Sequence, residues 1–389
     1  MAANEVVYFH SAETGAPTLN NAAGSLIAVL DACLITGFRP ITLTSLSVSG
    51  GIATAVFNGH GFEADRLLDM AGAGISALNG RKRVLVSATN TYTFDATGVA
   101  DTASVSGTIT AKRSPIGWVK QYAGTNKAVY ARSDVTVMPQ VLRIDDTGTG
   151  SAGTTYARAN AAESATDVDT LVGSMAASGS GQCWNKGANT ATAKNWALVG
   201  DGKSFYLFAD GDVITYGSTG GLTLQGFGDL IPNKSGDQYA SFLIGADNSG
   251  TNYSITPYNS WTSSMTASTM LLSRSYSGLG ANGVRCAVHA LWSVSAANDL
   301  PVFPSVVDNG VEIEYPIRVR QSSVTFGNPY RGVLPGLGFM LGNVSGTLHK
   351  RKLDNLVGTS RSFRALTYAT GSNASNNVGV VLDETGPWQ

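Results

Sequence analysis

The hydrophobic and polar positions of the chain alternate with a period of two over most of its length, which is typical of β-strands with one buried face. One segment differs from this pattern. Between Asn21 and Gly37 the apolar residues recur at spacings of three and four. They form a single stripe: Leu26, Ile27, Leu30, Cys33 and Leu34. We therefore expect a helix there, capped by Asn20 or Asn21 and ended by Gly37 in a left-handed conformation.

Short alternating runs predict the strands. Residues 6–9 form the first run, before the helix. Within residues 41–112, alternating runs lie between Gly- and Asn-rich turns, which indicates a compact β unit. Its clearest strands are 91–94 and 105–109. Further predicted strands are 141–144, 196–199, 205–208, 242–244 and 286–292.

The cleanest alternation lies in residues 312–320. One face holds Ile313, Tyr315, Ile317 and Val319, and the other holds Glu312, Glu314, Arg318 and Arg320. Because Pro316 has no N–H for a β-ladder, we expect this strand at a sheet edge or ending there. Opposite charges on one face can set the register with another chain, so the strand is a candidate edge between subunits.

Two stretches lose the alternation: residues 145–194 and residues 246–284, both rich in small polar side chains. Long loops are uncommon in compact domains and usually have a function. We therefore expect both stretches to be long loops that reach neighbouring subunits.

Composition narrows the function classes. Only 14% of the 389 residues are charged, and the formal net charge is −1. A charge so close to zero gives no electrostatic basis for binding nucleic acid or an acidic membrane, and it favours self-association.

The start of the chain lacks the features of a secretory signal, and no run of about 18 apolar residues predicts a membrane span. The three cysteines, Cys33, Cys183 and Cys286, suggest neither disulfides nor a zinc site, and we expect folding in a reducing cytoplasm.

Two glycine motifs resemble nucleotide-binding loops without their context. Gly202-Lys203-Ser204 lacks the earlier glycine of a phosphate loop, because Ala197 stands there, and a strand-like run follows it. A hairpin with Asp201-Gly202 as a two-residue turn of positive φ explains it better. The G-x-G-x-x-G of Gly278, Gly280 and Gly283 also precedes a strand-like run, so we interpret it as a loop.

Other chemistry-bearing residues form no motif. The histidines His10, His60, His289 and His349 are isolated, and Asp145-Asp146 and Asp167/Asp169 are interpreted as surface acids. The basic clusters 81–83 and 350–352 are interpreted as solvated faces or subunit contacts. Aromatic residues are interpreted as core or interface anchors, with a sugar-binding platform as the alternative: Trp118, Tyr122, Tyr130, Trp184, Trp196, Tyr253, Tyr258 and Trp261. We expect no catalytic, cofactor-binding or metal-binding residues.

Several blocks resemble virion proteins of tailed double-stranded DNA bacteriophages. Within residues 51–112 these are Gly51 to Ala55, His60-Gly61-Phe62, Leu78-Asn79-Gly80, Tyr92-Thr93-Phe94 and Ser106-Gly107-Thr108, which together resemble a small β-barrel module. Residues 24–34 resemble the opening helix of such proteins. Blocks at 117–118, 124–126, 142–146, 196–202, 227–229, 329–336 and 382–388 continue the resemblance over nearly the whole chain.

The resemblance implies a mainly β protein with an N-terminal α+β element (1–40), a small β-barrel module (41–113) and a larger β-sandwich-like region with long loops (114–389), with a sub-boundary near 295–310. It implies a non-enzymatic, homo-oligomeric tail component: tail tube or trunk, tail tip or baseplate, or head-to-tail region. The partners would be the chain itself, as a ring or trimer, and other virion proteins, with assembly in the bacterial cytoplasm; no specific nucleic acid and no membrane insertion are expected.

Other functions stay open. One alternative is a receptor- or carbohydrate-binding virion protein that uses Tyr253, Tyr258 and Trp261 to bind a host surface glycan. Another is a head decoration protein. A third is a glycan-degrading enzyme that uses Asp167 and Asp169, which requires two carboxylates about 5–9.5 Å apart in a cleft.

Overall fold

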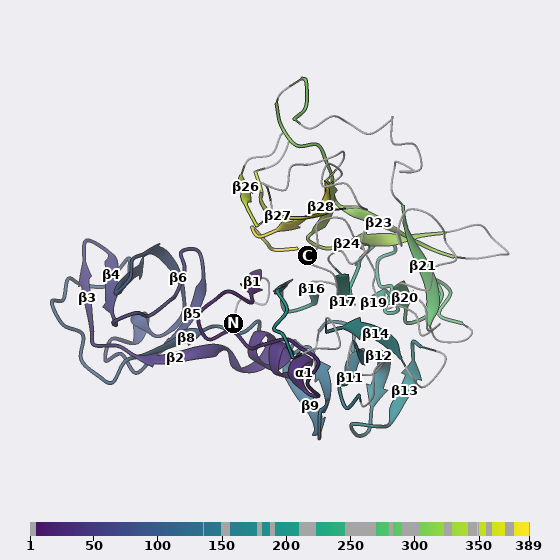
Figure 1. Ribbon diagram of the computed structural model, residues 1–389, viewed down its shortest axis with the longest axis horizontal. Helices are drawn as coiled ribbons and strands as arrows, with labels where there is room; N and C mark the ends of the chain where they lie inside the picture. The colour runs from purple at the N-terminus through teal and green to yellow at the C-terminus, as the bar shows by residue number, and fades with distance from the viewer. Residues whose placement is uncertain are drawn as a thin grey trace.

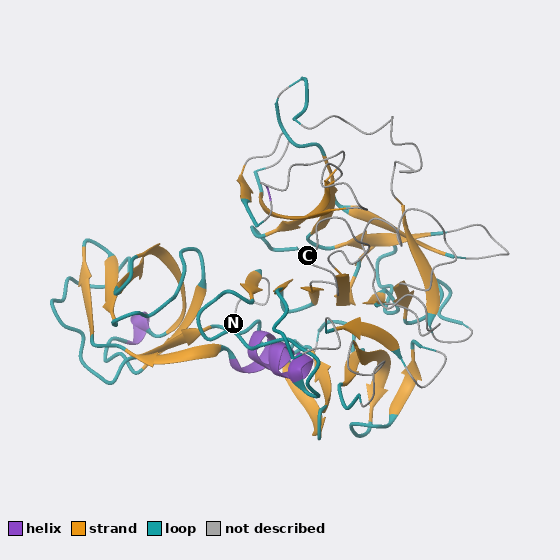
Figure 2. Cartoon of the chain, in the orientation of Figure 1, coloured by secondary structure: helices purple, strands orange, loops and turns teal. Residues whose placement is uncertain are grey.

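The structure is a computed structural model in which the described residues are 5–134, 136–148, 156–176, 181–186, 191–209, 223–245, 270–279, 283–289, 304–307, 309–322, 329–340, 348, 350–354, 360–369 and 377–388. Within these ranges the chain forms four antiparallel sheets and little helix (Figures 1 and 2). The predicted mainly β fold is therefore confirmed.

A seven-stranded sheet curls into a half-barrel, called the barrel below, on one side of the molecule (Figure 1). Its strands in spatial order are β2 (Phe38–Thr42), β8 (Thr110–Arg113), β5 (Leu67–Ala71), β6 (Gly80–Ser87), β7 (Thr91–Asp95), β4 (Ile52–Val56) and β3 (Ser45–Ser49). The two end strands, β2 and β3, are consecutive in the chain. Leu43 N donates to the Ile109 carbonyl, and Thr44 N donates to the Val56 carbonyl of β4. One bent stretch of chain thus joins both ends of the sheet.

The barrel core consists of alternate apolar residues, among them Leu46, Tyr92 and Phe94, with the 3-10 turn η2 (Ser76–Leu78) beside it. The predicted strand at 105–109 is wrong, because regular pairing begins only at β8. Gly107 has φ +112° there, and a Cβ at this position would lie 2.1 Å from the Gly72 carbonyl oxygen. The backbone at Gly107 passes so close to the backbone at Gly72 that only glycine fits there, and residues 105–109 do not form a regular β-ladder.

The predicted helix is present as α1 (Ser25–Leu30), which continues into the π-helical η1 (Asp31–Thr36). Its predicted caps differ. Neither asparagine caps it; instead the Asp146 carboxylate accepts from Leu26 N at 2.9 Å, so a residue far along the chain supplies the cap. Gly37 has φ +71° with ψ −178°, which is not left-handed helical, and a Cβ there would lie 2.1 Å from the Arg113 carbonyl oxygen.

A ten-stranded sheet forms the centre of the rest of the molecule. Its order is β1 (Val7–His10), β15 (Trp196–Gly200), β16 (Ser204–Ala209), β17 (Thr223–Asp229), β19 (Ser241–Ile244), β20 (Met270–Leu272), β21 (Val284–His289), β23 (Ile317–Gln321), β24 (Tyr330–Leu334) and β18 (Ile231–Pro232). The first strand, β1, lies beside the barrel and belongs to this sheet, paired with β15. The N-terminal strand thus links the two parts of the molecule.

Two smaller sheets cover the ten-stranded sheet. The six-stranded sheet contains β13 (Leu171–Ser174), β12 (Tyr156–Ala165), β11 (Val141–Asp145), β10 (Lys127–Ala131), β9 (Val119–Gly124) and β14 (Gln182–Asn185), which pairs with β12. The five-stranded sheet contains β22 (Ile313–Glu314), β25 (Leu337–Met340), β28 (Asn377–Asp383), β27 (Ser362–Ala369) and β26 (Lys352–Asp354).

The side chains of β15 show this layering. Leu198 packs in a core shared with α1 and the six-stranded sheet, whereas the adjacent Val199 packs in a core shared with the five-stranded sheet. Consecutive residues of β15, β16, β17 and β19 are accordingly all buried. Strands buried on both faces lose the polar alternation of a half-exposed strand. In the region predicted to be sandwich-like, the ten-stranded sheet thus packs against α1 and the six-stranded sheet on one face and against the five-stranded sheet on the other.

The predicted long loop 145–194 is wrong, because it contains β12, β13 and β14. Its alternation is hard to see in the sequence because small alanines occupy the inward positions of β12, such as Ala157, Ala159 and Ala161. In the second predicted loop, residues 246–269 and 280–282 lie outside the described residues, and β20 begins at Met270.

The expected single strand 312–320 is divided at Pro316. Residues before it form β22 in the five-stranded sheet, and residues after it form β23 in the ten-stranded sheet. β23 lies between β21 and β24, so most of this candidate subunit edge is wrong. The predicted alternation itself is confirmed in β23, where Ile317 and Val319 are buried and Arg318 is exposed.

Candidate functional site

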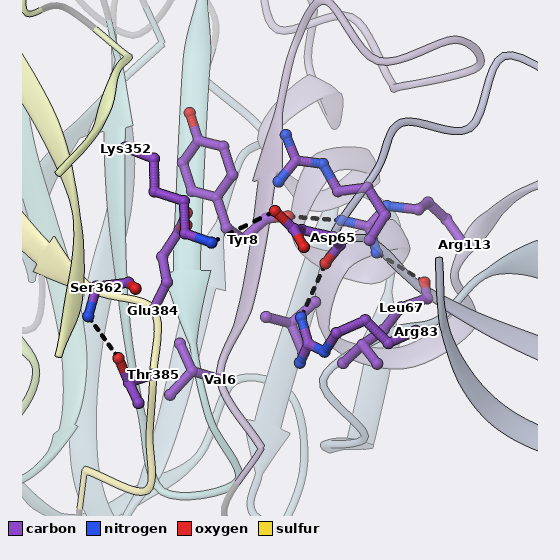
Figure 3. Close-up of a pocket in the computed structure, with 12 residues that line it drawn as sticks. Val6, Tyr8, Asp65, Leu67, Arg83, Arg113, Lys352, Ser362, Glu384 and Thr385 are labelled. Atoms are coloured by element: carbon purple, nitrogen blue, oxygen red, sulfur yellow. Dashed lines mark hydrogen bonds and ion pairs between the residues drawn. The ribbon is translucent and has the colours of Figure 1, made fainter. Parts of the chain in front are cut away.

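A polar cavity of about 260 Å³ lies where the barrel meets β1 and the five-stranded sheet (Figure 3). Its walls come from three parts of the chain that are far apart in sequence. β1 contributes Tyr8, the barrel contributes Asp65 and Arg83, and the five-stranded sheet and the segment after it contribute Lys352 and Glu384. The cavity is the best candidate site in the described part of the chain because charged groups converge on it.

Arg113 is the buried centre of this junction. Its side chain is 1% exposed, and Nε donates to Glu13 Oε2 at 2.6 Å. The other guanidinium nitrogens donate to the carbonyls of Leu67 in the barrel and Tyr8 in β1. Its Cζ also lies 4.6 Å from the ring centroid of Phe9. One side chain thereby joins the barrel, the Glu13 turn and the free edge of β1.

A second chain of charges continues from Glu13. Arg66 Nε lies 4.0 Å from Glu13 Oε1, and Arg66 Nη2 donates to Glu63 Oε2 at 2.6 Å. Glu63 Oε2 also lies 3.1 Å from His10 Nε2, across the junction. The hydrogen bond with His10, together with the Arg66 charge, lowers the pKa of Glu63 from its ordinary 4.5 to about 2.

The lowered pKa of Glu63 predicts a pH dependence of stability. A carboxylate with a depressed folded-state pKa adds stability above its unfolded pKa of 4.5, and this stability is lost as the pH falls toward 2. The loss is modest because the Glu63 side chain is 41% exposed and solvent screens its partners. We expect Glu63→Gln to flatten the fall in melting temperature over this range. Glu312→Gln, an exposed control, should keep the wild-type slope; equal slopes for both variants would contradict the assignment.

Tyr8 is held between two cations. The Cζ atoms of Arg66 and Arg364 lie 5.0 and 4.9 Å from its ring centroid. The Tyr8 hydroxyl is buried and has no hydrogen-bond partner among the described residues. Burial raises the pKa of Tyr8 well above its ordinary value, so the hydroxyl stays protonated and can donate.

Residues of both basic clusters contribute to this junction, where Arg83 and Lys352 stay partly exposed, as the solvated-face interpretation expects. From the first, Arg83 donates to the Asp65 carbonyl at 2.8 Å, and Arg81 donates to the Ile116 carbonyl at 2.9 Å. From the second, Lys352 Nζ lies 3.4 Å from Asp65 Oδ2. These residues therefore combine an exposed surface with hydrogen bonds and an ion pair to other parts of the same chain.

The other predicted features have structural roles. Gly202-Lys203-Ser204 forms the predicted β15–β16 hairpin, but neither Asp201 nor Gly202 has positive φ. The Asp201 carboxylate shapes the turn by accepting from Lys203 N and Ser204 N, both at 2.8 Å. Gly280 lies outside the described residues, and Gly283 leads into β21, as the loop interpretation requires.

The exposed acids Asp167 and Asp169 are held by neighbouring groups. Asp167 Oδ1 accepts from Asp169 N and Thr170 N, which lowers its pKa. Asp169 pairs with Lys127 and Arg143, and these partners lower its pKa as well. Both carboxylates lie at the surface, as the interpretation as surface acids requires.

Asp145 and Asp146 act separately. Asp145 pairs with Arg143, whereas Asp146 is fully buried, pairs with Lys186 and caps α1. Among the histidines, His10 contacts Glu63, and His60 Nδ1 accepts from Phe62 N. The side chain of His289 and all of His349 lie outside the described residues.

Four of the five aromatic candidates within the described residues are core residues, as predicted. Trp118, Tyr130, Trp184 and Trp196 are all buried in the core beneath the six-stranded sheet, and Tyr122 is half-buried. Tyr253, Tyr258 and Trp261 lie outside the described residues. Nowhere in the described ranges do three His, Cys, Asp or Glu side chains gather in a way that suits a metal ion. None of the described helices has the length and apolar character needed to cross a membrane.

Tyr8, Glu13, Asp65 and Arg113 were not singled out from the sequence. Each lacks a local motif, and Arg113 and Glu13 are separated by 100 positions. The one sequence signal that pointed to this junction was the pair of basic clusters.

Comparison with known proteins adds little. No protein-family profile and no curated protein matches the chain. Among solved structures, the chain is similar to the phage phi92 endosialidase, with a TM-score of 0.17 and 11% identity over 89% of this chain. The chain spans about half of that protein, 52% of its length. A TM-score of this size assigns neither a fold nor a function.

Proposed function

We propose that the chain is a structural protein of a tailed bacteriophage particle, a homo-oligomeric tail component that acts in assembly. The resemblance of its sequence blocks to virion proteins motivates the class. The structural observation that supports self-assembly is the six-stranded sheet, whose end strands β9 and β13 each pair on one side only in the described part of the chain.

These edges carry exposed apolar side chains. Val119 of β9 is 44% exposed and Val172 of β13 is 49% exposed. β9 holds one charged side chain, Lys120, which pairs with Asp31 of its own chain, and β13 holds none. An unpaired strand edge without free charge is a template for pairing with another chain. The net charge of −1 provides little repulsion between copies.

Lysine on both edges tests this proposal. We expect Val119→Lys/Val172→Lys to raise the dissociation constant of self-association about tenfold or more, because each new charge must be desolvated on pairing. Light scattering over a concentration series measures the effect. Val307→Lys is the matched control, since Val307 is 90% exposed in a turn that belongs to neither strand. A strictly monomeric wild-type chain, or an edge variant that assembles normally, would refute the proposal.

Placement of the chain in an imaged particle distinguishes the finer functions. Density in the tail tube, baseplate or head-to-tail region supports the tail proposal. Density on the head surface supports a head decoration protein, and an exposed distal position with glycan binding supports the receptor-binding alternative. Absence from mature particles would contradict the whole class.

A further inference from the structure

Two cations from opposite walls of the junction cavity contact the same residue, Asp65. Lys352 extends from β26 toward the Asp65 carboxylate, and Arg83 extends from β6 and donates to the Asp65 backbone carbonyl (Figure 3). The contacts of Lys352 Nζ within the described residues are long, 3.4 Å to Asp65 and 3.8 Å to Asp354. The Lys352 and Arg83 side chains are 37% and 42% exposed, so both remain accessible from solvent.

The other charges that line the cavity are already held by close partners. Glu384 makes two hydrogen bonds of 2.8 Å with Arg364, and Arg113 is bound to Glu13. Arg66 is bound to Glu63 at 2.6 Å. Arg83 donates to the Asp65 carbonyl at 2.8 Å and shares Glu5 with Arg81, at 3.2 and 3.9 Å. Lys352 is therefore the cation with the most capacity for a further partner, and the exposed Arg83 lies across the cavity from it.

The backbone on both walls is held in an unusual conformation. Asp65 has φ +64° and Lys350, two residues before Lys352, has φ +62°. Such left-handed conformations are uncommon for residues other than glycine, although aspartate adopts them more often than most. Hydrogen bonds from Asp65 N to the Val84 carbonyl and from Lys350 N to the Ala365 carbonyl hold them. Conformations of this kind concentrate at ligand-binding positions.

Tyr8 forms part of the third wall of the cavity. Its ring lies between Arg66 and Arg364, and its hydroxyl points away from Lys352 and Asp65 and is buried (Figure 3). The groups that can bind a ligand in the cavity are therefore the exposed cations and hydroxyls of the other two walls.

We propose that this cavity binds a small organic anion whose carboxylate or phosphate oxygens lie between Lys352 and Arg83. The ligand would take over the contact that Asp65 makes with Lys352 and would join the barrel to the five-stranded sheet. A volume of about 260 Å³ exceeds the need of a single ion, because one water occupies about 30 Å³. It suits a molecule with an anionic group and further hydroxyls, which Ser362 and Thr385 on the same wall can contact. The proposal is independent of the assembly role.

Calorimetry of the full-length chain at constant ionic strength tests the site with three probes: inorganic phosphate, glucuronate and glucose. We expect glucuronate or phosphate to bind, with at least tenfold weaker binding by Lys352→Gln and by Arg83→Gln. Lys234→Gln, an exposed lysine outside the cavity, should bind as the wild type does. Melting temperatures of the free variants show whether each one folds.

Each outcome decides the proposal. Glucuronate binding alone assigns a carboxylate ligand, and phosphate binding alone assigns a phosphorylated one; both support the site if the Lys352 and Arg83 variants lose binding. Binding that is unchanged in folded Lys352→Gln and Arg83→Gln means an adventitious ion only and overturns it. No binding of either anion, or glucose binding as tightly as glucuronate, also overturns it.

Discussion

Replacing Arg113 by methionine is expected to lower the free energy of unfolding by about 3–5 kcal/mol. Methionine keeps an apolar side chain of similar length, but it leaves the Glu13 carboxylate without its closest partner. Glu13 is 4% exposed and would keep only the His10 N–H and the distant Arg66. The Leu67 and Tyr8 carbonyls would each lose the hydrogen bond from the guanidinium as well, and Leu67 would keep the one from Ser114 N. Denaturant unfolding measures the change.

The control for this variant is Arg318→Met. Arg318 is exposed on β23, so the same chemical change there should alter the free energy of unfolding by no more than about 0.5 kcal/mol. A double variant with Glu13→Gln tests the cause, because it removes the unpaired charge and should recover part of the loss. Equal stabilities of Arg113→Met and Arg318→Met would show that the junction does not depend on this ion pair.

Replacing Trp388 by alanine is expected to lower the free energy of unfolding by about 3–5 kcal/mol. The Trp388 side chain is 4% exposed in the core between the ten- and five-stranded sheets. Its ring lies 5.8 Å from that of Tyr206, and Nε1 donates to the Asp383 carbonyl at 2.9 Å. The substitution opens a large cavity near the end of the described chain. Thermal and denaturant unfolding measure the loss.

Gly336 provides the complementary test of this packing. A Cβ at this position would lie 2.0 Å from Trp388 Cε2, and Gly336 has φ +67°. Gly336→Ala should therefore also destabilise the protein, and the combined variant with Trp388→Ala should lose less than the sum, because the steric clash is gone. Val307→Ala, at an exposed position, should change stability by no more than about 0.5 kcal/mol. Additive losses would place the origin of the Gly336 effect in its backbone alone.

The junction has a consequence for how the two parts of the molecule hold together. The barrel meets the rest of the chain through apolar packing, with Phe38 and Leu67 in one core with Phe9, and through polar pairs. These pairs are Arg113 with Glu13, Glu63 with His10, and Lys352 with Asp65. The first pair is buried and insensitive to salt, whereas the Lys352 pair is partly exposed and screened. A ligand bound between Lys352 and Arg83 would add contacts between the barrel and the five-stranded sheet on the exposed side of the junction, where the Lys352–Asp65 pair is long and screened.

Local pattern alone determined the elements whose periodicity comes from their own residues. The helix stripe at Leu26 to Leu34, the β15–β16 hairpin and the alternation of Ile317 and Val319 are all in the structure. The strands of the six-stranded sheet with inward alanines were missed, because Ala157 and Ala159 give too weak a hydrophobic contrast to show which face is buried.

The tertiary structure decided what depends on contacts between distant residues. The cap of α1 comes from Asp146, Pro316 divides its strand between two sheets, and the cavity joins Tyr8, Asp65 and Lys352 from three separate parts of the chain. A sequence shows the spacing of neighbours along one strand or helix, so it predicts which face of that element is apolar. It does not show which distant charge or carbonyl will lie within 3 Å after folding, because that distance is set by the packing of whole sheets.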